Sequence, residues 1–329
     1  MLFVDNENCT NPRVNLAIEE YLLRNIAPEE DILLFYINEP SIIIGRNQNT
    51  VEEINVDYIQ AHNIHVVRRL SGGGAVYHDL GNLNFSFMAP ITDSNFHNFH
   101  VFTAPVIQVL NEMGVPAELG GRNDILMEGH KISGNAQYST GKRMFSHGTL
   151  LYNSDLSHVN DALKVKASKI ESKGIKSIRS RVANITEFLN DPPDIATFKQ
   201  KLLEGIFAGE KPIPQYHLTN EDWDAIQALS ASRYQTWEWN YGRSPAFNIY
   251  KNQLFPIGEI DARLYVEKGL IQNIKFFGDF LGQGDVAELE ALLTGTHYTP
   301  EALQEKLTHI NVSHYFGALT PEELIWLLY

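Results

Sequence analysis

The stretch "RRLSGGGAVYHDLGN", Arg68–Asn82, carries more information about the fold than any other segment of the chain. A β-rich run, "IHVVRR", leads into three consecutive glycines, and "AVYHD" and "LNFSFMAP" are β-rich runs that follow them. Consecutive glycines let the backbone approach a ligand closely, and their N–H groups can surround an anion. With Arg68 and Arg69 beside them, the glycines predict an anion-binding loop that joins strand to strand.

The loop matches neither common nucleotide-binding motif. A P-loop needs four residues between its two glycines, whereas six separate Gly134 from Gly141, the best candidate pair in the chain. A Rossmann fingerprint needs a third glycine at the start of a helix, but Tyr77 occupies that position and a strand follows. The chemistry of the loop therefore has to be inferred from its neighbours.

Helices and strands alternate around the loop. Apolar residues at helical spacing predict a helix over Asn11–Ile26, with Asn11 as its N-cap and Pro12 in its first turn. Two β-rich runs, Ile32–Ile37 and Ser41–Ile44, flank a turn and are expected to pair with each other. Further helices are predicted over Val51–His62 and Phe99–Met113. This half of the chain predicts a mostly antiparallel or mixed sheet with helices packed on it.

A second, smaller domain is predicted from about Ala246 onward. The aromatic segment "TWEWNYGRSPAFN" ends in glycine and proline punctuation, and strands with a turn at Lys268 and Gly269 follow it. Two helical segments come after these strands. We therefore expect an α+β protein with a catalytic domain over residues 1–245 and a small α+β domain over residues 246–329.

Composition narrows the function. The chain has 329 residues, 43% of them hydrophobic, and no apolar run of the roughly 18 residues that a membrane span needs. Its N-terminus does not resemble a signal peptide, so we expect a cytoplasmic protein. Forty acids against 26 basic residues give a net charge of −14, which argues against nucleic-acid binding. The single cysteine, Cys9, excludes an internal disulfide.

Three further groups are candidates for chemistry. Lys131, in "HKISGNAQY", is either a surface residue of a strand or a catalytic cation that points into a cleft. His147, in "FSHGTLLYN", has at most a contact role, because a lone histidine on a strand is usually structural. Lysines and arginines dominate residues 164–181, where Glu171 is the only acid, and a solvated surface helix is their simplest explanation.

Taken in order, "RRLSGGGAVYHDLGN", "GRND", "KISGNAQ", "HGTLLYN", "KGIKSIRSRVANIT" and "WEWNYGRSPAFN" resemble the lipoate–protein ligase family along nearly the whole chain. The resemblance implies a catalytic domain related to biotin ligases and class II aminoacyl-tRNA synthetases, followed by a small accessory domain. It also implies that lipoate and ATP form lipoyl-adenylate and that the lipoyl group passes to a lysine of a carrier domain. The expected carriers are the acyltransferase subunits of 2-oxoacid dehydrogenases and the glycine-cleavage H protein.

The resemblance also assigns residues. Lys131 would be the catalytic residue, donating to the lipoate carboxylate and to the α-phosphate. The expected lipoate contacts are Arg69, Ser71, Gly72, Gly73, Gly74, Lys131, Ser133 and His147. The expected ATP contacts are Arg69, Gly74, Ala75, Val76, Tyr77 and Lys131. ATP brings Mg²⁺, for which Asp124 is the expected acid unless it forms a salt bridge with Arg122. The basic run becomes an adenylate lid containing Lys173, Lys176, Arg179 and Arg181.

Related activities remain as alternatives. Octanoyl and lipoyl transferases of the same fold use a cysteine nucleophile in the catalytic sheet, whereas Cys9 lies far upstream. Biotin ligases carry a "GRGR" loop that this chain lacks. A non-catalytic protein that only binds lipoyl domains is the alternative from a different functional class.

Overall fold

A computed structural model describes residues 1–329 except residues 93, 96, 122, 164–181, 243–246 and 268. The described chain forms two compact units. The first consists of Met1–Ile43, Glu53–Arg68 and Val76–Asn240, and the second of Ile44–Glu52, Arg69–Ala75 and Tyr241–Tyr329. The second unit therefore combines the C-terminal segment with two short segments from early in the sequence, one of which is the glycine loop. The predicted domain boundary at Ala246 falls among the undescribed residues and stays a prediction.

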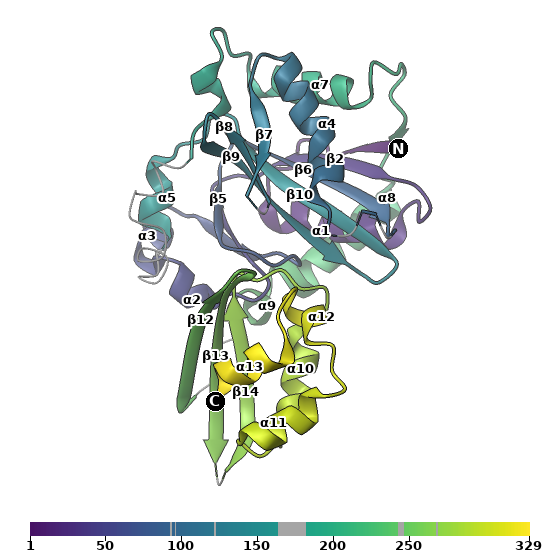
Figure 1. The fold of residues 1–329 in the computed structure, drawn as a ribbon. Coiled ribbons are helices and arrows are strands. Elements are labelled where there is room, and N and C mark those ends of the chain that lie inside the picture. The colour runs from purple at the N-terminus through teal and green to yellow at the C-terminus, as the bar shows by residue number, and fades with distance from the viewer. Residues whose placement is uncertain (93, 96, 122, 164–181, 243–246, 268) are drawn as a thin grey trace. The chain divides into compact units, whose positions relative to one another are not determined.

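An eight-stranded mixed sheet forms the centre of the first unit (Figure 1). In spatial order its strands are β11 (Gln215–Tyr216), β1 (Leu2–Asp5), β2 (Ile32–Ile37), β6 (Asn82–Pro90), β10 (Arg143–Leu151), β9 (His130–Ser139), β8 (Asp124–Met127) and β7 (Ala117–Gly120). β1 is parallel to β2 and β11, and the pairs from β2 to β7 are antiparallel. The predicted α+β class with a mixed sheet is confirmed.

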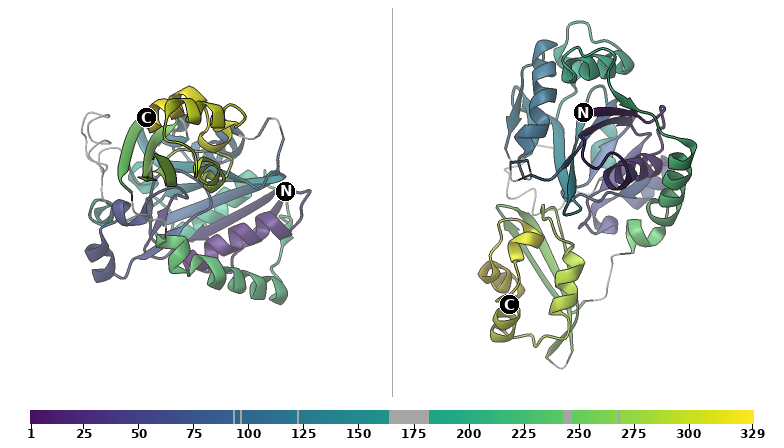
Figure 2. Two further views of the ribbon diagram at one scale, coloured as in Figure 1. Left: turned by 90° about the horizontal axis from the view of Figure 1, so that it is seen from below. Right: turned by 90° about the vertical axis from the view of Figure 1, so that its right-hand side faces the viewer.

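Helices cover both faces of this sheet. On one face, α4 (Phe99–Glu112) and α7 (Ile195–Ile206) bury Phe102 and Phe198 in a core that includes Met144 and Leu150 of β10. Because side chains alternate along a strand, His147 points to the other face of β10. It meets α1 (Pro12–Asn25) there, and α1 packs in turn against α8 (Asn220–Leu229), as Figure 2 shows from two further sides.

The first helix begins as the sequence predicts. The Asn11 side chain accepts a hydrogen bond from the Arg13 N–H at 2.9 Å, and Pro12 occupies the first helical position, where no N–H is needed. The predicted helix over Val51–His62 is instead two short helices, α2 (Thr50–Glu53) and α3 (Val56–Ala61). It divides because the Asn55 side chain accepts from the Tyr58 N–H and so starts a new helix.

The expected pairing of the two early strands is wrong. β3 (Ser41–Ile44) lies between β4 (His65–Arg68) and β5 (Val76–His78) in a separate three-stranded sheet, whereas β2 pairs with β1 and β6. The strand bounds were predicted correctly from local pattern. Their partners were not, because strands distant in sequence, β1 and β6, occupy both edges of β2.

A three-stranded antiparallel sheet with helices on one face forms the C-terminal part of the second unit (Figure 1). Its strands are β12 (Ile249–Phe255), β13 (Gly258–Glu267) and β14 (Leu270–Gly278), and its helices are α10 (Val286–Leu293), α11 (Pro300–Leu307), α12 (Val312–Phe316) and α13 (Pro321–Leu328). Ile260, Ala262 and Leu264 alternate along β13 into an apolar core with these helices. On the opposite face, Arg263 donates to buried Asp261 at 3.1 and 3.0 Å.

Short elements connect the larger ones. They are α5 (Ser157–Ala162), η2 (Ile185–Phe188), η3 (Ser230–Tyr234) and α9 (Trp237–Tyr241). η3 is fixed to α1 through Glu20, a buried carboxylate that accepts from Arg24 at 2.8 Å, from Arg233 at 2.6 Å and from the Tyr234 hydroxyl at 2.9 Å. Three donors satisfy this buried charge, as its burial requires.

We predict that Glu20→Ala lowers the free energy of unfolding by about 3 kcal/mol, because it leaves Arg233 and Tyr234 without a buried charged partner. Chemical denaturation monitored by circular dichroism measures the change. Glu210→Ala is the control, because Glu210 is exposed and should change the free energy by no more than about 0.5 kcal/mol. Equal stability of the two variants would contradict the role given to Glu20.

Candidate functional site

Lys131 is a half-exposed cation near the start of β9 whose ammonium group has a defined partner. Its Nζ lies 2.8 Å from Oδ1 of Asp124, the first residue of β8, and the two side chains are 37% and 33% exposed. Gly134 provides the space for this pair, because a Cβ at that position would lie 2.9 Å from Nζ. The sequence left open whether Lys131 faces outward or into a site, and the structure places its ammonium group beside an acid of the neighbouring strand β8.

The main chain of Lys131 is held as well. Its carbonyl accepts from the Ala183 N–H at 3.1 Å, and Lys131 forms a parallel bridge with Val182. The predicted lid, with Lys173, Lys176, Arg179 and Arg181, ends directly before Val182 in sequence but lies outside the described residues. So does Arg122, the alternative partner that the sequence suggested for Asp124.

Ser133 and His147 lie in the same sheet as Lys131. Ser133 is fully buried and its hydroxyl accepts from the Asn135 amide at 3.2 Å. His147, on β10, faces α1, where its Nδ1 lies 2.9 Å from the carboxylate Oε1 of Glu19. Both side chains of this pair are at least 90% buried. Sequence reasoning missed Glu19, because a glutamate on an amphipathic helix cannot be told from a solvent-facing one.

The glycine loop is organised by Arg69. This side chain is 6% exposed and donates from Nη2 to the carbonyls of Gly72 at 2.6 Å and Gly74 at 2.9 Å, and from Nε to the Ser71 hydroxyl at 3.0 Å. These contacts lie within the loop of Arg69 itself, and the contact with phosphate expected from the sequence stays a prediction. Gly72 is required for close packing, because a Cβ there would lie 2.5 Å from the Phe280 carbonyl oxygen.

Arg68, before the glycines, and His78 and Asp79, after them, make contacts that hold the chain in place. Arg68 is buried and donates from Nε to the Trp239 carbonyl at 2.9 Å, while its own carbonyl accepts from the Trp239 indole at 2.8 Å. His78 Nδ1 lies 3.0 Å from the Asn38 amide, and Asp79 accepts from the Gly81 and Asp155 N–H groups at 2.9 and 2.7 Å. His78 and Asp79 therefore fix the chain that follows the loop.

Val76 and Tyr77 begin β5, and Ala75 precedes them. Tyr77 is 7% exposed, and burial, followed by the charges of Asp79 and Asp155, raises the pKa of its hydroxyl far above the ordinary value. A neutral, buried phenol next to the loop offers an apolar ring rather than a titrating group. That property fits contact with an aromatic ligand.

The candidate residues thus fall into two groups. Lys131, Asp124, Ser133, His147, Val76 and Tyr77 belong to the first unit. Arg69, Ser71, Gly72, Gly73, Gly74 and Ala75 belong to the second. Within the part of the chain that the structure describes, no three histidine, cysteine, aspartate or glutamate side chains are grouped to hold a metal ion.

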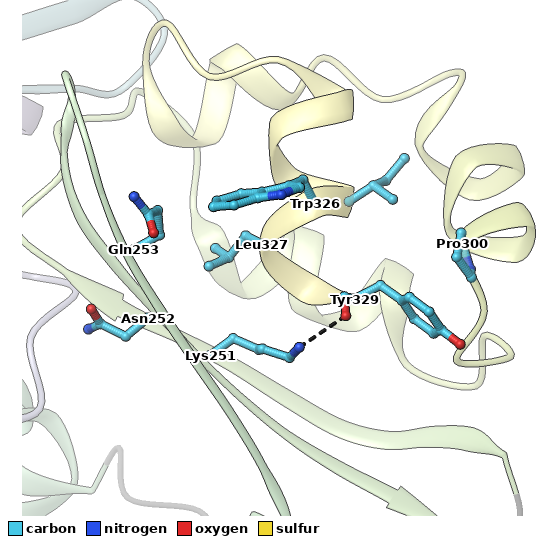
Figure 3. A pocket seen from close by; sticks show the side chains of 8 residues that line it. Lys251, Asn252, Gln253, Pro300, Trp326, Leu327 and Tyr329 are labelled. Atoms are coloured by element: carbon cyan, nitrogen blue, oxygen red, sulfur yellow. Dashed lines mark hydrogen bonds between the residues drawn. The ribbon is translucent and has the colours of Figure 1, made fainter.

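A cleft of about 480 Å³ lies elsewhere in the second unit, between β12 and α13 (Figure 3). Lys251 lines this cleft and donates to the Tyr329 carbonyl at 3.0 Å. Trp326, which is 65% exposed, lines the cleft as well. None of the site residues predicted from the sequence lines this cleft.

Among the described helices, none is both long and apolar enough to span a bilayer.

Comparisons with known proteins agree along the whole chain. The family model of the lipoyl protein ligase A/B catalytic domain matches residues 11–207, and that of the bacterial lipoate protein ligase C-terminus matches residues 244–328. A lipoate-protein ligase of Bacillus subtilis is 56% identical over the full length of both chains. Lipoate–protein ligase 1 of Staphylococcus aureus is 54% identical, also over the full length of both.

Solved structures show the same likeness. LipL1 of P. falciparum in complex with lipoate superimposes with a TM-score of 0.77 at 26% identity, and the match covers 94% of each chain. A lipoate-protein ligase A bound with ATP has a TM-score of 0.62 at 30% identity, covering 74% of this chain and 97% of the other. A bipartite ligase of Thermoplasma acidophilum, studied with its E2 lipoyl domain, has a TM-score of 0.65 at 30% identity, covering 75% of this chain and 98% of the other.

We predict that Gly134→Ala displaces the Lys131 ammonium group from Asp124 without unfolding the sheet. The added Cβ lies against the far end of a flexible side chain, which moves more easily than the backbone. A crystal structure of the variant should show Nζ beyond hydrogen-bond distance of Oδ1. Gly74→Ala is the matched control, because no atom lies within 4 Å of its added Cβ. An unchanged 2.8 Å separation in Gly134→Ala would refute the packing argument.

Proposed function

Because the chain belongs to the lipoate–protein ligase family, we propose that it activates free lipoate with ATP to lipoyl-adenylate and transfers the lipoyl group to a carrier lysine. The single observation that carries this proposal is the Lys131 ammonium group, held by Asp124 on a half-exposed strand end. Relatives named lipoate–protein ligases match over the whole chain, and structural neighbours were solved with lipoate and with ATP. The proposed role is lipoate salvage in the cytoplasm.

Lys131 would bring two anions together. A carboxylate repels the phosphates of ATP, and its oxygen must lie close to the α-phosphorus before it can attack. An ammonium group donates to both at once through separate N–H groups, and each charge-assisted bond contributes roughly 1.5–3 kcal/mol. Negative charge grows on the bridging oxygens during attack, so the lysine stabilises the transition state more than the bound substrates.

The glycine loop would supply the rest of the binding site. We propose that Ser71, Gly72, Gly73 and Gly74 contact the lipoyl carboxylate region, with Ser133 and His147 contributing from the sheet. Gly74, Ala75, Val76 and Tyr77 would contact the nucleotide. The contacts of Arg69 support a role in shaping the loop, and its direct contact with phosphate stays a prediction. We also propose residues 1–245 as the catalytic domain, residues 246–329 as the accessory domain and Lys173–Arg181 as the adenylate lid.

Mg²⁺ is proposed as the companion of ATP, and the donor set around Asp124 suits it poorly. A magnesium site usually combines one or two carboxylates with phosphate oxygens. Asp124 Oδ1 already lies 2.8 Å from an ammonium group, which would repel a divalent cation. This contact argues against Asp124 as the metal ligand, an assignment that stays an untested prediction. No step of the proposed reaction depends on it.

The decisive experiment offers the purified protein, lipoate and Mg·ATP to apo lipoyl domains of dehydrogenase acyltransferases and to apo H protein. Mass spectrometry should detect lipoylation of at least one carrier. We predict that Lys131→Ala lowers kcat for lipoate-dependent exchange of pyrophosphate into ATP at least about 100-fold, equivalent to about 2.7 kcal/mol of transition-state stabilisation. Undiminished exchange by Lys131→Ala would remove the lysine from the mechanism. Carrier binding without exchange by the wild type would favour the non-catalytic alternative.

A transferase mechanism through a cysteine has a separate test. Cys9 lies in the loop before α1, and burial raises the pKa of its thiol, which lowers the fraction of nucleophilic thiolate. We predict that Cys9→Ser retains the exchange and lipoylation rates within about two-fold, since the thiol takes no part. Loss of lipoylation by a stably folded Cys9→Ser protein would support the transferase alternative.

A further inference from the structure

An irregularity in strand pairing directs Lys131 toward Asp124. Between β8 and β9, Leu126 pairs with Lys131 and Ile125 pairs with Ser133, so that Ile132 is an extra residue on β9. Such bulges re-aim a neighbouring side chain and occur often next to active sites. Without the bulge, Asp124 would pair with Ser133, but with it Asp124 pairs with Gly134.

Gly134 completes the arrangement. The partner opposite Asp124 has no side chain, and the Lys131 side chain occupies the vacant space, with Nζ 2.9 Å and Cε 3.1 Å from where a Cβ would stand. The bulge, the glycine and the acid thus act on one ammonium group. A half-exposed pair of this kind adds little to folding stability, because water screens it. Stability alone therefore does not account for three coordinated features.

We propose that Asp124 is the positioning residue for Lys131: its carboxylate keeps one N–H of the ammonium group and so aims the other two at the lipoate carboxylate and the α-phosphate. The proposal rests on the function proposed above. An ammonium group has three donors, so it can retain Asp124 while it binds both ligands. Asp124 touches neither ligand in this arrangement and acts only through Lys131.

The Asp124 carboxylate should weaken the binding of both substrates, and this effect can be tested. Lipoate and ATP are both anions, and a carboxylate within a few ångströms of their binding position repels them. Asp124 therefore weakens binding of the ground state while it improves the orientation of Lys131. A metal ligand has the opposite effect on ATP, because its removal weakens Mg·ATP binding. A purely structural residue has neither effect.

The experiment compares Asp124→Asn and Asp124→Glu with the wild type. Calorimetry measures the Kd of lipoate without nucleotide and of Mg·ATP without lipoate, and pyrophosphate exchange measures kcat and KM. For Asp124→Asn we expect lipoate and Mg·ATP to bind about three- to five-fold more tightly, kcat to fall at least about ten-fold and the Tm to stay close to that of the wild type. Asp124→Glu should recover part of kcat and restore wild-type binding, because it returns the charge.

Glu128→Gln is the matched control. Glu128 is exposed in the turn of the same β8–β9 hairpin, and its substitution removes the same charge without touching Lys131. We expect its kcat and Kd values within about two-fold of the wild type. Weaker or unchanged binding of lipoate or of Mg·ATP by Asp124→Asn, or an unchanged kcat, would overturn the proposal. The wild type decides the proposed function separately, because absence of lipoate-dependent exchange there would refute the function itself.

Discussion

The antiparallel pairing of β10 with both β6 and β9 is the constraint on which the first unit depends. It places nine consecutive residues of β10 against β6 and orients every second side chain toward α4 and α7. The intervening side chains, including His147, must then face α1. The same pairing fixes the register of β9, and β9 carries both Ser133 and Lys131. A one-residue slip would move each of these groups to the wrong face.

The second constraint is that buried charged groups need hydrogen-bond partners. Three buried arginines of this acidic chain donate to main-chain carbonyls: Arg68 to Trp239, Arg69 to Gly72 and Gly74, and Arg143 to Ile26 and Ala27. Each one fixes a loop or a helix end through these carbonyls. Because a guanidinium group is planar and carries several donors, one arginine can satisfy several carbonyls at fixed geometry. These three arginines therefore shape the chain.

Local patterns in the sequence predict where single helices and strands lie, but not which strands pair or which side chains meet. Pro12 and Asn11 predict the start of the first helix, and β-rich runs predict β2 and β3 with their correct bounds. The pairing of β2 with β3 was wrong, because chain proximity gave no information about β1 and β6. Lys131 could be selected because the motif around it is distinctive. Its contact with Asp124 could not, since it depends on a bulge at Ile132 that leaves no mark in the residue pattern.

The sequence assigned Arg69 to binding and Lys131 to catalysis, and the structure describes different surroundings for the two cations. Both are cations beside glycines, and residue type alone predicts that both meet an anion. Arg69 is 6% exposed and its donors reach three groups of its own loop, so its geometry is largely determined before any ligand arrives. The Lys131 side chain is 37% exposed. Its ammonium group contacts Asp124 and can rotate about the bond between Cε and Nζ. A compact ammonium group on a flexible stem adjusts to the position of an anion more readily than a planar guanidinium group that already donates to its own loop.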